Sequence, residues 1–100
     1  MQDIRYIIIH RPGPQWVAGR TMFEQPGLRE HVEHYRGLLD AGKLLAGGPF
    51  LDAFAAGMMI PSAGQSETEM REFAAADPAV KSGLLVAEVH EWLVGMKATP

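Results

Sequence analysis

The sequence predicts an α+β domain in which four strands form one antiparallel sheet and two helices cover one of its faces. Two observations lead to this fold class. The chain has 100 residues, of which 47% are hydrophobic, so it is long enough for one core and too short for two. Stretches with the patterns of strands and helices follow one another in the order β-α-β-β-α-β. Residues 1–100 are therefore expected to fold as a single domain.

The first strand is predicted over Ile4–His10, where β-branched and aromatic residues precede a break rich in proline and glycine. Its three consecutive isoleucines do not alternate with polar residues, which indicates that both faces of the strand are covered. The next segment, residues 11–25, has no sustained period and is long for a connection. It is interpreted either as a lid over a binding site or as an ordered loop that Trp16 pins to the body.

A helix is predicted to begin near Pro26 and to stop at Gly42. Its apolar stripe is formed by Leu28, Val32, Tyr35 and Leu39. Charged residues, Arg36 among them, fall away from the stripe on a helical wheel. His31 lies at the edge of the stripe, where an imidazole is shielded from water yet can reach a cavity.

Lys43–Phe50 and Ala55–Ile60 are predicted to form the next two strands, joined as a hairpin. Glycine and proline occupy residues 47–49, near the end of the first of these strands. A glycine inside a strand marks a bulge or the close approach of another backbone or a ligand. Gly48 and Pro49 are for this reason candidate substrate contacts.

Ser66 and Glu69 match a capping box, in which each side chain bonds to the other residue's backbone amide at the start of a helix. This second helix is expected to end at Asp77, because Pro78 disfavours helical geometry in the residue before it. The fourth strand is predicted over Leu84–Leu93. The resulting order of elements is that of a ferredoxin-like fold.

The predicted sheet leaves one face in need of a partner. Two helices can cover only the other face, while the strands are apolar on both sides. The same face of a second copy is the simplest cover. A homodimer with its sheets face to face is therefore expected, and assembly beyond the dimer stays open.

The composition narrows the partners and the location. The net charge is -3, and lysines and arginines are scattered singly, so neither nucleic acid nor an anionic membrane is an expected partner. The lack of cysteine excludes a disulfide scaffold and thiol chemistry. No charged leader precedes the first apolar run, and no run reaches membrane length. A soluble cytoplasmic protein that binds a small molecule is the expectation.

His31 and Asp77 are the predicted catalytic residues. A carboxylate at the C-terminal end of a helix faces the unfavourable end of the helix dipole, so Asp77 is expected to have a compensating partner. An imidazole is a fitting one, because a carboxylate fixes its tautomer and raises its basicity, as in a general acid or base. The alternative is structural: Asp-Pro is a common turn dipeptide, and His31 would then be a packed side chain.

Several other residues are candidates for binding the substrate. His10 and Arg11, at the end of the first strand, would hold an anionic or phenolic oxygen, unless they merely enter the loop. Asp52 would line a cavity or simply terminate its strand. The cavity is expected to be closed by Trp16, Met22 and Phe23.

No metal site and no cofactor are predicted. His31 and His34 stand three residues apart on one helix, but no HExxH-like pattern surrounds them. The other two histidines, His10 and His90, fall on separate strands. The glycines within residues 47–49 do not lead into a helix, so they form no phosphate loop.

Two short motifs resemble the YciI-like (YCII-related) family. The first runs from His31 to Phe50, with the histidine eleven residues before the turn Gly-Lys-Leu-Leu, which Gly-Gly-Pro-Phe then follows. The second is Ala-Ala-Asp-Pro at residues 75–78. The similarity extends from the first strand to the last, and the long segment after His10 departs from the shorter members.

The resemblance implies a small dimeric α+β barrel with a proposed active-site pair, which His31 and Asp77 match by motif position. It also places substrate contacts on the hairpin, where Asp52 and Met58 are the matching positions. A relative is associated with dehydrochlorination of a chlorinated hydroxyquinol. The wider superfamily includes lactone isomerases and monooxygenases that act without a metal.

The leading hypothesis is a small enzyme in which His31, oriented by Asp77, transfers a proton in an isomerisation or elimination on a small aromatic or lactone-like substrate. The alternative is a binding or regulatory module that holds a metabolite in the same cavity. A third interpretation, a barrel that handles haem or oxygen, requires a ligand histidine facing the cavity.

Overall fold

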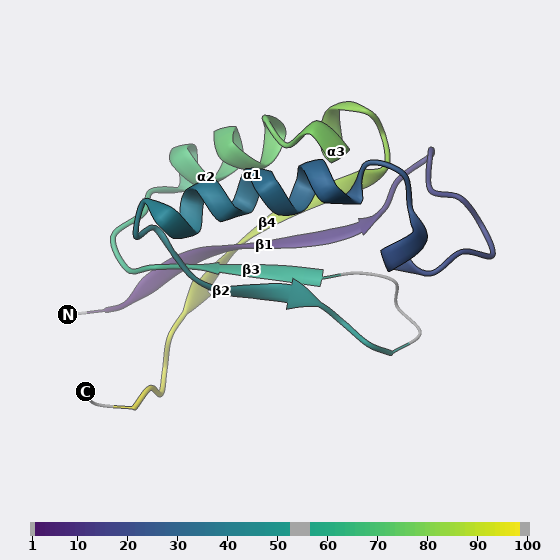
Figure 1. Cartoon of the computed structure of the whole chain (residues 1–100). Coiled ribbons are helices and arrows are strands. Elements are labelled where there is room, and N and C mark those ends of the chain that lie inside the picture. The colour runs from purple at the N-terminus through teal and green to yellow at the C-terminus, as the bar shows by residue number, and fades with distance from the viewer. Residues whose placement is uncertain (1, 53–56, 99–100) are drawn as a thin grey trace.

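The computed structural model describes residues 2–52 and 57–98 and confirms the predicted α+β class, with a four-stranded antiparallel sheet (Figure 1). The elements in chain order are β1 (Ile4–Pro12), the 3-10 helix η1 (Met22–Glu24), α1 (Leu28–Asp40), β2 (Leu44–Pro49), β3 (Gly57–Pro61), α2 (Glu67–Ala75), α3 (Pro78–Lys81) and β4 (Leu85–Leu93). The predicted order of strands and helices is thus present, and the short helices η1 and α3 are additions to it.

The strands lie in the order β2-β3-β1-β4, so β1 is flanked on both sides. Ile8 of β1 stands opposite Met59 of β3 and Val89 of β4. β1 continues two residues beyond its predicted end, because Arg11 and Pro12 still pair with the start of β4. Since side chains alternate along a strand, this register places Ile8 and its two partners on one face.

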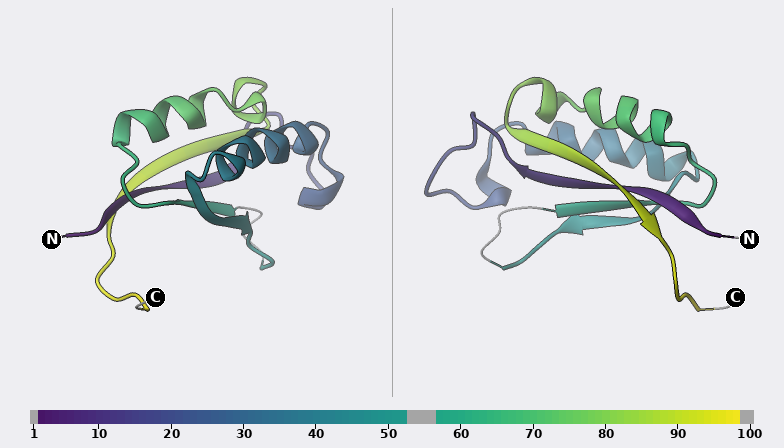
Figure 2. Two further views of the ribbon diagram at one scale, coloured as in Figure 1. Left: turned by 60° about the vertical axis from the view of Figure 1, so that its left-hand side comes forward. Right: turned by 180° about the vertical axis from the view of Figure 1, so that it is seen from behind.

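Helices α1, α2 and α3 all lie on that face of the sheet (Figure 2). The main core between the two layers is built from Ile8, Tyr35, Leu38, Met70 and Ala74. The buried side of α1 is formed by His31, Tyr35 and Leu38. Val32 and Leu39, which the sequence assigned to the buried stripe, are each 45% exposed. The helix is therefore turned so that His31 lies within its buried side and not at the edge.

Helix α3 was not predicted, and it changes the position of Asp77. Helix α2 ends at Ala75, and Asp77 is the N-cap of α3, with Pro78 in the first turn. Its Oδ1 accepts a hydrogen bond from the backbone N–H of Ala79 at 2.9 Å. The carboxylate thus caps the N-terminus of a helix, which is the favourable end, and the predicted unfavourable dipole is wrong.

The segment after β1 is an ordered loop. Gln25 is buried, and its side-chain amide both accepts from the backbone N–H of Val17 at 2.8 Å and donates to the carbonyl of Val17 at 2.9 Å. Trp16 packs against a second small core formed by Ala79, Leu84 and Leu85. The ordered-loop interpretation therefore agrees with the structure better than a lid held by Trp16.

The hairpin strands β2 and β3 pair as predicted, with a bulge between Leu44 and Ala46. The third strand was predicted from Ala55, but residues 53–56 lie outside the described part of the chain. β3 is described from Gly57 and continues to Pro61. Across the described residues, no helix has the length and apolar character needed to cross a membrane.

The second face of the sheet carries none of the described helices (Figure 2). Ile7 and Ile9 of β1 and Met58 of β3 lie half-buried on it, and Trp92 of β4 is exposed. The side of the sheet away from the helices thus combines these apolar side chains with charged ones, among them the ion pair of Arg11 and Glu88. The predicted homodimer depends on this face and stays a prediction.

Candidate active site

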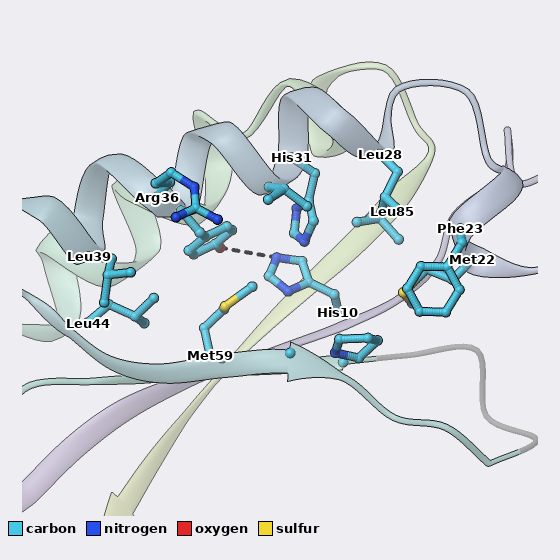
Figure 3. A pocket seen from close by; sticks show the side chains of 16 residues that line it. His10, Met22, Phe23, Leu28, His31, Arg36, Leu39, Leu44, Met59 and Leu85 are labelled. Carbon is cyan, nitrogen blue, oxygen red and sulfur yellow. Dashed lines mark hydrogen bonds between the residues drawn. The ribbon is translucent and has the colours of Figure 1, made fainter.

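A cavity of about 310 Å³ lies between α1 and the strands β2 and β3 (Figure 3). Its wall is mostly apolar and includes Met22, Phe23, Val32, Leu39, Leu44 and Met59. Three glycines of the hairpin strands also line it. The polar side chains in the wall are His10, His31, Tyr35 and Arg36. An apolar cleft with a few convergent polar groups is the usual form of a small-molecule site.

His31 and Asp77 form a buried pair beside this cavity. Nδ1 of His31 lies 2.5 Å from Oδ2 of Asp77. His31 stands in the first turn of α1 and Asp77 caps α3, so the packing of two helix N-termini brings them together. Asp77 is fully buried and His31 lines the cavity. The predicted contact is present, and the catalytic role of the pair stays a prediction.

The surroundings of Asp77 favour its charged form. Burial opposes ionisation, but the hydrogen bond and charge of His31, the backbone N–H of Ala79 and the charge of His10 outweigh it and lower the pKa of Asp77. Both carboxylate oxygens therefore have a partner. A carboxylate in this position holds the ring proton of His31 on Nδ1 and leaves the lone pair of Nε2 for a substrate.

His10 reaches the same cluster from β1. Its Nε2 lies 3.1 Å from the hydroxyl oxygen of Tyr35 and 3.7 Å from Oδ2 of Asp77, the second distance being too long for a hydrogen bond. Burial, assisted by the charge of His31 and opposed by that of Asp77, lowers the pKa of His10 to about 4. Burial, together with the charge of Asp77, also raises the pKa of Tyr35. At neutral pH, His10 is uncharged and Tyr35 keeps its proton.

Ring packing fixes the orientation of this cluster. The rings of His10, His31 and Tyr35 meet edge to face, with centroids 4.8 Å, 5.2 Å and 5.3 Å apart. His34 also meets the ring of Tyr35 edge to face, but it stacks on Phe73, and its Nε2 contacts the carbonyl of Phe73 at 2.7 Å. His34 therefore belongs to the packing between α1 and α2.

His10, His31 and Asp77 are also a possible ligand set for a metal ion. Each offers one ligand atom, and these atoms lie within 4.8 Å of one another. Two imidazoles and a carboxylate are ligands that Zn²⁺ accepts. A cation bound there would have to displace the proton between His31 and Asp77 and the hydrogen bond between His10 and Tyr35. The observed contacts are those of an acid–base cluster.

Some of the predicted substrate-binding residues do line the cavity. These are His10, Gly48, Pro49, Met22 and Phe23. The hairpin glycines remove side chains at the wall, in agreement with the idea that a ligand approaches the backbone there.

Arg11 and Trp16 do not line the cavity. Arg11 forms an ion pair with Glu88 of β4 at the surface, because its position on β1 puts it on the face opposite to that of His10. Trp16 belongs to the long loop and packs against the second core.

The hairpin residues Asp52 and Met58 are likewise outside the cavity wall. Met58 stands opposite Ile9 of β1, on the face of the sheet away from the helices, whereas the neighbouring Met59 points into the cavity. Two adjacent methionines give no alternation from which the inward one could be chosen. Asp52 follows β2, and it is not among the described residues that line the cavity.

Several residues of the cavity were not predicted to be there, among them Tyr35, Arg36 and Met59. Tyr35 was assigned to the core stripe and Arg36 to the solvent side of α1. Arg36 follows Val32 by four residues, so both side chains lie on the same side of the helix. Because α1 is turned so that His31 is buried, the side of α1 that carries Val32 and Arg36 faces the cavity.

Comparison with known proteins supports the resemblance inferred from the motifs. A family model described as the YCII-related domain matches residues 4–93. The matched span includes every strand and both His31 and Asp77. Searches of curated proteins and of solved structures gave no significant match.

Proposed function

The chain belongs to the YCII-related domain family, and from its buried His–Asp pair we propose that it is a small enzyme in which His31 moves a proton on the substrate. The reaction is an isomerisation or an elimination, such as loss of hydrogen chloride, on a small aromatic or lactone-like molecule. The observation that carries this proposal is the 2.5 Å contact between Nδ1 of His31 and Oδ2 of Asp77 beside an apolar cavity.

The two ring nitrogens of His31 have separate tasks in this proposal. Nδ1 is bound to Asp77, and Nε2 has no hydrogen bond to any described residue. Nε2 takes the proton from the substrate, and Asp77 stabilises the imidazolium that results. Nε2 then returns the proton elsewhere on the product or releases it after elimination. General base catalysis of this kind is typically worth about two to four powers of ten in rate.

The cavity limits the substrate to a small molecule. A volume of about 310 Å³ lies at the lower end of ordinary ligand sites, which begin near 300 Å³. Apolar walls favour a ring or a short hydrocarbon body over a sugar or a nucleotide. In this proposal the reaction proceeds by proton transfer alone.

The test is a screen of chlorinated phenols and lactones with the wild type, followed by the His31→Ala variant. We expect turnover by the variant to be at least about 100-fold slower than turnover by the wild type. His90→Ala is the matched control, because His90 is exposed on β4 and outside the cavity. The control is expected to keep full activity.

Two results would contradict the proposal. Undiminished turnover in His31→Ala would exclude His31 as the base. Tight binding of a screened compound without turnover by the wild type would instead favour the alternative of a binding or regulatory module.

A further inference from the structure

One polar atom beside the cavity has no partner. Nδ1 of His10 is buried and makes no hydrogen bond to any described residue. The side chain of His10 is only 3% exposed, and it lines the cavity. In Figure 3, one nitrogen of His10 meets the hydroxyl of Tyr35, and the other lies on the side of the ring away from it. Leaving a buried polar atom unpaired costs about 1–3 kcal/mol, so such an atom calls for an explanation.

The contact with Tyr35 decides which atom of His10 carries the proton. If the hydroxyl of Tyr35 donates to Nε2, the ring proton sits on Nδ1, and that single N–H is left without an acceptor. If Nε2 donates to the hydroxyl oxygen instead, both the hydroxyl proton and the Nδ1 lone pair are left unpaired among the described residues. The first arrangement leaves fewer buried groups unpaired, so Tyr35 selects the Nδ1–H form.

We propose that Nδ1–H of His10 donates a hydrogen bond to a carbonyl oxygen of the substrate, and that the substrate is a small apolar carbonyl compound deprotonated by His31 at the carbon next to that carbonyl. Tyr35 is then a positioning residue, because it acts through His10. This inference rests on the proposed function and deepens it by naming the substrate class.

The step balances without any further reactant. Nε2 of His31 takes a proton from the carbon next to the carbonyl, and the electron pair of that C–H bond forms a carbon–carbon double bond. The carbonyl electron pair moves to the oxygen, where the hydrogen bond from His10 stabilises the enolate. The pair on the oxygen then re-forms the carbonyl. The pair of the carbon–carbon double bond either expels a leaving group from the adjacent carbon or, where the substrate has a conjugated double bond, shifts along it so that its far carbon takes the proton back from His31.

The neutral state of His10 suits this role. An uncharged imidazole that cannot itself take up a proton near pH 7 stabilises the oxyanion without competing with His31 as a base. The two rings are 4.8 Å apart between centroids and almost perpendicular. One substrate can thus contact both rings at adjacent atoms.

Glycines form the part of the cavity wall near His10. Gly57 of β3 stands opposite His10 in the sheet, and Gly48 of β2 is the next glycine of the same wall. A Cβ atom on Gly57 would lie 2.8 Å from the carbonyl oxygen of Gly48. The backbones of β2 and β3 therefore lie close together here, and these two positions carry no side chain.

The first experiment measures the tautomer of His10 by ¹⁵N NMR of the wild type near pH 7, which requires no variant and no substrate. We expect the proton on Nδ1 and an unprotonated Nε2. In Tyr35→Phe the preference for Nδ1–H should weaken. A wild-type ring with its proton on Nε2 would overturn the proposal.

The second experiment separates the two nitrogens by substitution. His10→Asn keeps an amide N–H near the position of Nδ1, whereas His10→Gln keeps a group near Nε2 and removes the donor at Nδ1. The probe is 4-nitrophenol, whose phenolate oxygen stands in for the enolate and whose absorbance reports its ionisation. We expect affinity for the phenolate to fall about 10-fold or more in His10→Gln, the loss of one hydrogen bond to a charged group, and to be retained within about threefold in His10→Asn.

The outcomes distinguish this inference from the proposed function. If His10→Gln and His10→Asn bind the phenolate equally well while turnover still depends on His31, the role of His10 is wrong and the proposed function stands. If the binding difference is found but no compound is turned over, the donor role stands and the proposed catalysis fails. Circular dichroism of each variant establishes that the fold is kept.

Discussion

Oδ2 of Asp77 accepts from Nδ1 of His31 at 2.5 Å, although 46 positions of the chain separate the two residues. The other oxygen of the same carboxylate caps helix α3 through the backbone N–H of Ala79. One side chain thus fixes the start of a helix and the tautomer of a histidine. Stability and proton transfer are therefore coupled at Asp77, and substitutions there should affect both.

Asp77→Asn should lower activity far more than stability. The amide oxygen can still accept from Ala79, so the cap survives, but the amide NH₂ then faces Nδ1 of His31 and forces the ring proton onto Nε2. Nε2 would no longer be a base, and we expect turnover to fall by about two to four powers of ten. The tautomer of His31 in ¹⁵N NMR and the rate on any substrate found in the screen are the two measurements.

Asp40→Asn is the control for this change, because Asp40 is exposed at the end of α1. It should leave the rate unchanged and alter the free energy of unfolding by less than about 0.5 kcal/mol. An Asp77→Asn protein that keeps its rate would show that the carboxylate does not orient the base.

The free energy of unfolding should depend on pH because of His10. Its pKa is about 4 in the folded protein against 6.5 without the fold, so between these values the unfolded chain binds a proton that the folded protein does not. The free energy of unfolding is therefore expected to decrease as the pH falls from about 6.5 to 4, by up to about 3 kcal/mol from His10. Urea unfolding at closely spaced pH values measures it.

The contribution of Asp77 falls in a different pH range. Its pKa is lowered by folding, so its stabilising effect is present at higher pH and is lost only as the pH falls below about 4. In His10→Asn the unfolding free energy should change less steeply between pH 4 and 6.5, by the amount that the uptake of one proton on unfolding contributes. The exposed His90→Asn should not show this difference. An unchanged slope in His10→Asn would contradict the neutral, buried state of His10.

The order of strands and helices and the pairing of His31 with Asp77 could be predicted from the sequence. The strands are β-branched runs bounded by glycine and proline, and Ser66 caps the second helix as its motif indicates. The reason given for Asp77 was wrong, because its carboxylate caps the start of α3 and does not end α2. The meeting of His31 and Asp77 depended on a fold that the element order already implied.

The rotation of α1 could not be predicted from hydrophobicity. His31 and Tyr35 are buried because they form hydrogen bonds to Asp77 and His10, whereas an apolar scale ranks Val32 and Leu39 above them. Helix α3 has four residues, too few for a period, although Asp followed by Pro is also a helix start. Long-range polar contacts thus decided the rotation of α1, and a sequence does not display them.

Gly57→Ala should destabilise the protein while Gly48→Ala should not. A Cβ on Gly57 meets the backbone carbonyl of Gly48 at 2.8 Å, and a backbone atom cannot move aside as a side chain can. We expect a loss of about 1–3 kcal/mol from overpacking between β2 and β3. A Cβ on Gly48 has no atom within 4 Å, which makes this variant the control. Equal unfolding free energies for the two variants would contradict the described hairpin pairing.

The last prediction concerns the sheet face away from the helices. Met58 lies half-buried on it between Ile9 of β1 and Gly48 of β2, and we expect a second copy to cover this face, as the sequence predicted. Met58→Lys should then turn a dimer of the wild type into a monomer in sedimentation analysis, because an unpaired charge in an interface is costly. Ala75→Lys places the same charge on exposed α2 and should stay dimeric. A monomeric wild type would exclude the face-to-face homodimer.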